Sequence, residues 1–235
     1  MSSQGPGPSE TGDPRSSMLG GGLLQALMRV PASRGAVAVM RHSARDDITD
    51  IRDAPFVPLN EAGMEAARAF GAALPKGRRL VLRHSPIPRC EQTATQILLG
   101  YGGGASEGPD EGLGIPYVLD LSGLVALAGQ MGQREFATRW FKDDLAPGVV
   151  QPSAVAARAL ATLATERLER ADAGDIHLLV SHDWNVLLLR ERLMGIALQE
   201  VGWLAFLDGV VFDREAMAPK PEISLYWGAE RSSRL

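Results

Sequence analysis

Three short apolar runs in this chain are each followed directly by a histidine that is accompanied by arginine or aspartate. The three segments are 41–45 (RHSAR) after the run 36–40, 83–94 (RHSPIPRCEQTA) after 80–82, and 181–183 (SHD) after 176–180. Guanidinium groups bind phosphate oxygens as a fork and keep their charge, and a neutral imidazole can act as a nucleophile. These residue types therefore predict chemistry on a phosphate group.

Hydrolysis of a phosphomonoester requires a nucleophile in line with the leaving oxygen, cations beside the equatorial oxygens and a proton for the departing alkoxide. His42 is the candidate nucleophile, which would form a phosphohistidine that water later hydrolyses. Asp183 is the candidate proton donor, because a carboxyl group near a dianionic phosphate has its pKa raised by like charge. The phosphoryl oxygens would be held by Arg41, Arg45, Arg89 and His182.

The elements that position these residues follow from the alternation of apolar runs and helical patterns, which predicts an α/β fold. In an open α/β sheet the ligand crevice lies at the carboxyl ends of the strands, so the three segments should converge. Strands are expected at 36–41, 176–180, 202–212 and 223–227, with a further strand and helix within 79–99. Helices are expected at 60–74, 155–168 and 184–194, a flexible insertion at 102–114, and a helical cap at 119–145.

Several motifs in this order resemble those of a known family. They are Arg41-His42 after the first strand, Ser85-Pro-x-x-Arg89-x-x-x-Thr93-Ala94 after the second, Ser181-His182 after a late strand, and Pro58–Gly63 at the start of a helix. Together they resemble the histidine phosphatase superfamily, which includes phosphoglycerate mutases and acid phosphatases, over roughly residues 36–212. The resemblance implies a phosphoglycerate mutase-like three-layer sandwich, with a mostly parallel central sheet and helices on both faces. It also implies a metal-independent phosphatase without a cofactor.

The resemblance assigns further roles to single residues. Ser43 stands where the family has glycine, and its hydroxyl could donate to a phosphate oxygen. Arg45 and Asp183 resemble the acid phosphatase branch, in which that aspartate is the proton donor. Mutase-like relatives place the acid in the middle of the chain, which leaves Asp120 as the rival donor. His84 is interpreted as a substrate contact lining the pocket at most.

Two other functional classes remain open. A metal-dependent phosphohydrolase would need a divalent site, which neighbouring arginines would disfavour by charge repulsion, and the His-Glu-x-x-His spacing is absent. A phosphoester-binding protein without catalysis is the third hypothesis, because of Ser43. The candidate metal ligands would be His42, His84, His182, Asp183, Asp46 and Asp47.

The whole chain has 235 residues, of which 45% are hydrophobic, enough to build the core of one domain. We expect residues 1–20, rich in Ser, Gly and Pro, to form a disordered tail, and 21–235 to form a single domain with a helical cap insertion around 102–152. Residues 23–30 are expected either to dock as a short amphipathic helix or to extend the tail.

Composition limits the partners and the compartment. The net charge of −4 argues against a general nucleic-acid partner, and no apolar run reaches the length that spans a membrane. The single cysteine, Cys90, rules out an internal disulfide framework. We therefore expect a cytoplasmic protein that acts on a small phosphorylated substrate or on a phosphoprotein. The sequence leaves the oligomeric state open.

Overall fold

The computed structural model describes residues 20–48, 51–215, 222–228 and 230–233. The described strands form one seven-stranded sheet in the order β3-β2-β4-β1-β5-β6-β7. They are β1 (Ala36–Arg41), β2 (Arg79–His84), β3 (Ala105–Pro109), β4 (Asp175–Ser181), β5 (Gly209–Glu215), β6 (Glu222–Trp227) and β7 (Glu230–Ser233). The helices are α1 (Gly21–Arg29), α2 (Glu61–Ala73), α3 (Pro88–Tyr101), α4 (Leu121–Met131), α5 (Gln133–Phe141), α6 (Ser153–Arg170), α7 (Asp183–Met194) and α8 (Leu198–Val201), with short 3-10 turns η2 (Ile51–Asp53) and η3 (Glu111–Leu113).

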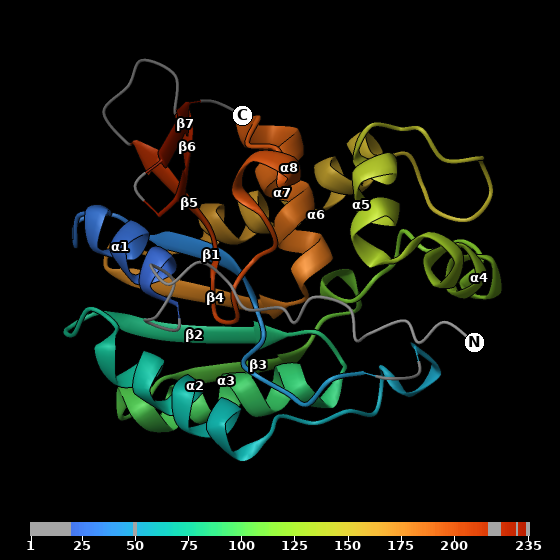
Figure 1. The fold of residues 1–235 in the computed structure, drawn as a ribbon. Coiled ribbons are helices and arrows are strands. Elements are labelled where there is room, and N and C mark those ends of the chain that lie inside the picture. Colours follow the sequence, from blue (N-terminus) through green and yellow to red (C-terminus); the bar gives the residue numbers. More distant parts are fainter. Residues whose placement is uncertain (1–19, 49–50, 216–221, 229, 234–235) are drawn as a thin grey trace.

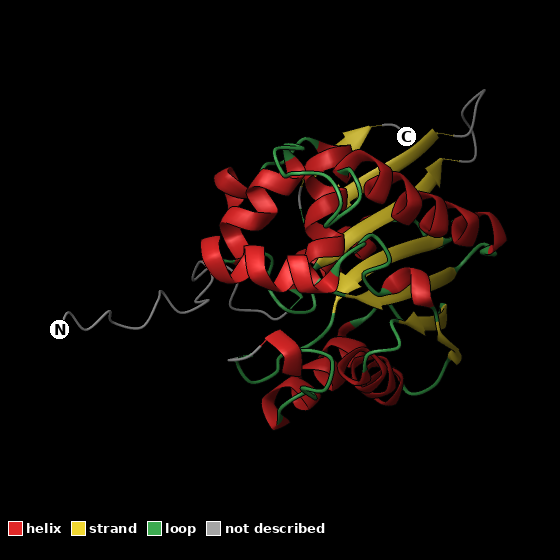
Figure 2. Cartoon of the chain, turned by 90° about the vertical axis from the view of Figure 1, so that its right-hand side faces the viewer, coloured by secondary structure: helices red, strands yellow, loops and turns green. Residues whose placement is uncertain are grey.

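The sheet combines a parallel part with an antiparallel edge. Strands β3, β2, β4 and β1 pair in parallel, whereas β5, β6 and β7 continue the sheet in antiparallel pairs. Helices cover both faces of this sheet (Figure 2). The expected α/β sandwich with a mostly parallel central sheet is confirmed.

Each face of the sheet has its own hydrophobic core. Strand β1 is buried along its whole length, and its side chains alternate between the two cores as the pleat requires. Val37 and Val39 pack on the side of α5, α6 and α7, whereas Ala36, Ala38 and Met40 pack on the side of α1, α2 and α3. Figure 1 shows α2 and α3 below β2, and α6 and α7 above β4.

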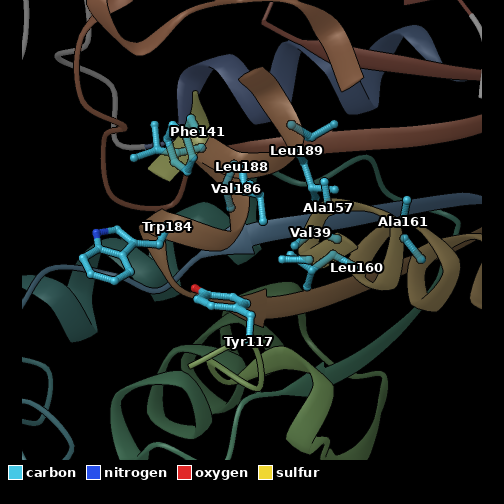
Figure 3. Packing of buried hydrophobic residues seen from close by; sticks show 14 of the residues in the cluster. Val39, Tyr117, Phe141, Ala157, Leu160, Ala161, Trp184, Val186, Leu188 and Leu189 are labelled. Carbon is cyan, nitrogen blue, oxygen red and sulfur yellow. The ribbon is translucent and has the colours of Figure 1, made fainter. Parts of the chain in front are cut away.

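Aromatic rings hold α5 against α7 in the first of these cores. Phe136 stacks on Trp184 with ring centroids 5.3 Å apart, and Trp140 lies 4.7 Å from Tyr117. Figure 3 shows Tyr117 and Trp184 beside the aliphatic side chains of α6 and α7. This packing fixes the beginning of α7, which carries Asp183.

The segment 102–114 differs from the expected flexible insertion. Gly102 ends α3 with a φ of 90°, and the chain then returns as β3 in parallel with β2, where Val81 pairs with Ala105. The segment contains three consecutive glycines, and Gly104 permits close packing, because a Cβ there would lie 2.7 Å from the Leu80 carbonyl oxygen. The glycines therefore serve a turn and a strand edge.

The strand expected at 202–212 is also shorter than predicted. It begins at Gly209, because Gly202, the C-capping residue of α8, has a φ of 79° and Leu207 has a φ of 61°, and neither conformation is compatible with a strand. The intervening loop 203–208 packs against the end of β1, where the Arg41 amide donates to the Asp208 carbonyl.

The structure also describes the N-terminal helix and the segment that was expected to form a helical cap. Helix α1 docks on the sheet and buries Leu23, Ala26 and Leu27, and α4 and α5 lie within the segment expected as the cap. The tail expected at 1–20 falls, except for Gly20, outside the described residues. Within the described part of the chain, none of the helices has the length and apolar character needed to cross a membrane.

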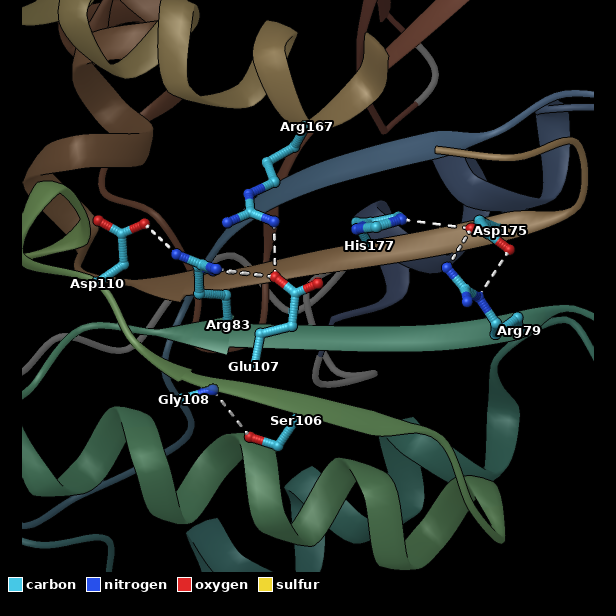
Figure 4. Close-up of polar contacts among 9 residues, drawn as sticks. All are labelled: Arg79, Arg83, Ser106, Glu107, Gly108, Asp110, Arg167, Asp175 and His177. Carbon is cyan, nitrogen blue, oxygen red and sulfur yellow. Dashed lines mark hydrogen bonds and ion pairs between the residues drawn. The ribbon is translucent and has the colours of Figure 1, made fainter. Parts of the chain in front are cut away.

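A network of ion pairs joins β2, β3 and α6 near the start of η3. Arg83 contacts Glu107 and Asp110 at 3.0 Å each, and Arg167 of α6 also reaches Glu107 (Figure 4). Asp110 in turn accepts from the Gly112 amide. The network therefore anchors the turn that begins at Glu111.

Candidate active site

The three histidine-containing segments meet at the carboxyl ends of β1, β2 and β4. The His42 amide donates to the Ser181 carbonyl at 3.0 Å, and the Ser85 amide donates to the Val180 carbonyl at 2.9 Å. The convergence expected from strand order is therefore confirmed, because parallel strands end at the same edge of a sheet.

A cavity of about 480 Å³ opens at this edge, within the usual size range of small-molecule sites. Its lining comes from the loop around η2, the turn between β2 and α3, the segment from η3 to α5, and the start of α7. The predicted site residues that line it are His42, Arg45, Arg89, His182 and Asp183.

His42 is buried, with 3% of its surface exposed, and its tautomer is fixed by its partners. Nδ1 lies 2.7 Å from the Ser43 carbonyl, which can only accept, so Nδ1 carries the proton. Nε2 accepts from Arg89 Nε at 2.9 Å and therefore carries the lone pair. Burial, followed by the charges of Arg89 and Arg41, lowers the pKa of His42 well below 6.5, so the imidazole is neutral at pH 7.

His182 contacts the same guanidinium. Its Nδ1 lies 3.2 Å from Arg89 Nη2 and accepts from it, so Nε2 carries the proton and donates to Ser85 Oγ at 3.0 Å. Burial, followed by the charge of Arg89, lowers the pKa of His182 to about 3. The two rings are 5.7 Å apart and nearly perpendicular.

Two helix N-termini add to the positive potential of the cavity. Ile87 precedes α3 and His182 precedes α7 as the N-capping residues, and both line the cavity. Unpaired amides and the helix dipole make such N-termini favourable for anions. With Arg89 and Arg45 they form a site suited to a phosphate group.

Arg41 does not line the cavity, although it was expected to hold phosphoryl oxygens. It is 2% exposed, its guanidinium lies 4.0 Å from the ring centre of Phe206, and it donates to the Leu204 carbonyl. Its Nη2 pairs with Asp183 Oδ2 at 3.1 Å. Arg41 therefore acts on the site through the charge it places near His42 and Asp183.

Asp183 is held as a carboxylate in this geometry. Besides Arg41, Trp203 Nε1 donates to Oδ2 at 3.1 Å and the Trp184 amide donates to Oδ1 at 2.9 Å. Burial raises the pKa of Asp183, but Arg41, the Trp203 hydrogen bond and His182 outweigh it, and the net pKa lies below 3.8. A proton donor must instead carry its proton at the working pH.

Ser43 and His84 are buried beside the site but do not line the cavity. Ser43 Oγ donates to the Gly63 carbonyl at 2.7 Å, so its hydroxyl proton is used in a contact with α2. His84 Nδ1 lies 2.9 Å from the Ser85 carbonyl. The substrate contacts expected for these two residues stay predictions, and in this structure neither side chain is part of the cavity lining.

Several residues to which the sequence assigns no definite role also shape the site. Ser85 lines the cavity in place of His84, and Trp203 and Phe206 come from the loop that was expected to be a strand. Glu111 is the other carboxylic acid in the lining, whereas Asp120, the expected rival donor, is exposed at the start of α4 and does not line the cavity. Position in the middle of the chain was the available signal for Glu111.

A metal site was the alternative interpretation of the histidines and aspartates. Among the residues that the structure describes, no group of three or more His, Cys, Asp or Glu side chains is arranged to hold a metal ion. The cations nearest to His42 are guanidinium groups.

Comparison with known proteins places this geometry in context. The model of the histidine phosphatase superfamily (branch 1) matches residues 37–210, and no curated protein sequence matches the chain. The chain is similar to a mycobacterial glucosyl-3-phosphoglycerate phosphatase, with 18% identity, 83% of this chain and 99% of that chain covered, and a TM-score of 0.55.

Two further solved structures share the fold. A phosphoserine phosphatase from Entamoeba histolytica, in complex with 3-phosphoglyceric acid, is 16% identical over 86% of this chain and 97% of that chain, with a TM-score of 0.56. A phosphoglycerate mutase from Bacillus anthracis is 14% identical over 86% and 93%, with a TM-score of 0.52. The resemblance of Arg45 and Asp183 to the acid phosphatase branch gains no support from this branch 1 match.

Proposed function

The chain belongs to the histidine phosphatase superfamily, and from this we propose that it hydrolyses small phosphomonoesters through a phosphohistidine on His42. The observation that carries the proposal is the neutral His42 imidazole, whose Nε2 lone pair faces a guanidinium in a cavity lined by cations. A nucleophile in the correct tautomer, held beside a phosphate-binding group, is what in-line transfer requires.

In the first step Nε2 of His42 forms a bond to phosphorus as the bond between phosphorus and the alcohol oxygen breaks. The phosphate group displaces the Arg89 hydrogen bond from Nε2, and Arg89 then donates to phosphoryl oxygens together with Arg45 and the Nε2 proton of His182. In the second step water attacks phosphorus and gives its proton to the carboxylate that protonated the alkoxide in the first step, and the bond between phosphorus and Nε2 breaks to release inorganic phosphate and neutral His42. Arg41 supports the first step, because its charge helps to keep the His42 imidazole neutral.

The proton for the departing alkoxide has two candidate sources. The sequence favours Asp183, but its ion pair with Arg41 and its hydrogen bond from Trp203 favour the carboxylate. Glu111 lines the same cavity, is exposed, and lies in the middle of the chain, where mutase-like relatives carry their acid. We therefore assign the proton transfer to Glu111 and a positioning role to Asp183.

The two assignments differ in their dependence on the leaving group. Loss of a general acid slows the release of a basic alkoxide far more than the release of p-nitrophenolate, which needs no proton. Glu111→Gln should therefore lower kcat for an alkyl phosphate by about 100-fold, with a much smaller effect on p-nitrophenyl phosphate. The same selective loss in Asp183→Asn, with Glu111→Gln unaffected, would return the role to Asp183.

The overall proposal is tested by hydrolysis of p-nitrophenyl phosphate in excess EDTA. We expect turnover that resists EDTA and disappears in His42→Ala. Arg89→Gln should lower kcat by about 100-fold or more, because it removes one preorganised donor to the transition state. Activity lost to EDTA and restored by a divalent cation would favour a metal-dependent phosphohydrolase. Phosphate binding without turnover of any monoester would favour a binding protein.

A further inference from the structure

We infer that the substrate is the monoester of an apolar alcohol, one whose carbon skeleton is alkyl or aryl without several hydroxyl, amino or carboxyl groups. This inference rests on the proposed function, because the phosphate group must occupy the site beside His42. It concerns the rest of the cavity, which receives the leaving group.

The polar and the apolar residues of the cavity lining come from different segments of the chain. Its polar lining is concentrated among the residues that would hold the phosphate, which follow β1, β2 and β4. The loop around η2, the turn before α3, the segment after η3 and the cap helix α4 contribute mainly apolar side chains. These include Ile48, Pro55, Ile87, Ile115, Leu121 and Val125.

Few polar partners are present for the leaving group. Beyond the phosphate-binding residues the polar side chains of the lining are Arg52, Glu111 and Gln133, and all three are exposed. A sugar, an amino acid or a carboxylate would exchange several hydrogen bonds to water for contacts with apolar walls, and each unpaired polar group buried in this way is costly. An apolar group loses nothing on the same transfer.

The solvent exposure of apolar side chains in the cavity lining also favours an apolar leaving group. Leu121 is 61% exposed and Ile115 is 41% exposed, although both line the cavity. Apolar surface left in contact with water at a concave site is covered favourably by an apolar ligand. The cavity of about 480 Å³ has room for such a group beside a phosphate.

A series of n-alkyl phosphates from ethyl to hexyl tests this inference, because the alcohols differ little in acidity and differ mainly in apolar area. We expect kcat/KM to rise about threefold for each methylene buried in the cavity. Hexyl phosphate should also exceed glucose 6-phosphate, which has a similar number of carbon atoms but several hydroxyl groups. A flat series, or faster hydrolysis of glucose 6-phosphate, would overturn the inference.

A pair of surface variants tests whether the apolar lining of the cavity causes the preference for longer alkyl chains. Leu121→Asn should lower kcat/KM for hexyl phosphate about tenfold more than for ethyl phosphate, since it removes apolar contact area without opening the core. Leu119→Asn is the matched control, because Leu119 is 58% exposed just before α4 and does not line the cavity. An equal loss on both substrates in Leu121→Asn, or the same selectivity change in Leu119→Asn, would contradict the assignment.

Hydrolysis of p-nitrophenyl phosphate by the wild-type chain and by His42→Ala distinguishes a failure of the substrate class from a failure of the proposed phosphatase activity. His42-dependent turnover without a preference for longer alkyl chains overturns the substrate class and leaves the phosphatase proposal intact. Absence of turnover on every monoester overturns both.

Discussion

Arg89 lies between the two histidines of the cavity and determines the form of each. It donates to Nε2 of His42 and to Nδ1 of His182, and it can do so only while both nitrogens lack a proton. Burial adds to this effect, so the pKa of each imidazole is lower than in water. The nucleophile is therefore available without a neighbouring base to deprotonate it.

The first prediction concerns the titration of these histidines. NMR of the imidazole nitrogens should show His182 neutral at pH 5, where a histidine of ordinary pKa is almost fully protonated, and should show that the pKa of His42 lies well below 6.5. Because the unfolded chain takes up these protons near pH 6.5, the free energy of unfolding should fall below that pH by about 1.4 kcal/mol per unit for each histidine. A transition of His42 near pH 6.5 would contradict the geometry.

The second prediction concerns the pair formed by Arg41 and Asp183. Asp183→Asn leaves the 2% exposed Arg41 without its carboxylate, which should lower the free energy of unfolding by about 3 kcal/mol in urea titrations at pH 7. Asp144→Asn is the control, because its pair with Arg139 is 71% and 40% exposed and contributes less than about 1 kcal/mol. Equal losses in both variants would show that the Arg41 pair does not hold the site together.

Single residues also show what could be predicted from the sequence. Neighbours along an extended chain point to opposite sides, so at each strand end one residue of a pair reaches the cavity and the other does not. His42 lines the cavity and Arg41 does not, and Ser85 lines it while His84 does not. The motif identified both pairs, but only the strand register shows which member faces the ligand.

At the scale of elements, helix α2 is pressed against the loop that follows β1. A Cβ on Gly63 would lie 1.9 Å from the Ala44 carbonyl oxygen, and the Gly63 carbonyl accepts from Ser43 Oγ. This close approach holds the loop that carries Ser43 and Arg45, and it explains why a helix contains glycine at this position. The Pro58–Gly63 motif therefore allows α2 to pack closely against the loop that carries Ser43 and Arg45.

The third prediction follows from this contact. Alanine normally stabilises a helix by about 1 kcal/mol relative to glycine, so Gly129→Ala in α4, where a Cβ meets nothing within 4 Å, should raise stability. Gly63→Ala should instead lower the free energy of unfolding and reduce phosphatase activity, because the helix must move away from Ala44. Stabilisation by both substitutions in denaturant titrations would contradict the proposed packing.

The elements divide clearly into those that the sequence predicts and those that it does not. Buried strands such as β1 and β4 and helices such as α2 and α6 follow from apolar runs and periodicity. Strand β3 contains no hydrophobic run, and it is stabilised by its backbone pairing with β2. The loop 203–208 lies in apolar sequence, and its turn depends on tertiary contacts with Arg41.

At the scale of the molecule, the carboxyl edge of the sheet supplies the reactive groups, and the segment from η3 to α5 supplies apolar lining of the cavity. The strand ends and the starts of α3 and α7 bring together the histidines and Arg89, whereas the segment from η3 to α5 closes the other side with apolar residues. Figure 1 shows α4 and α5 beyond the end of the strands. This division would let the phosphate chemistry stay constant while the cap sets the choice of alcohol.

The most direct test of this account is the isolation of the covalent intermediate. The chain is mixed with p-nitrophenyl phosphate, denatured under alkaline conditions that preserve phosphohistidine, and analysed by peptide mass spectrometry. We expect one phosphoryl group on His42 during turnover and none in His42→Ala. Turnover with no phosphoryl group on His42 at any time, or a phosphoryl group on His84 or His182 instead, would contradict it.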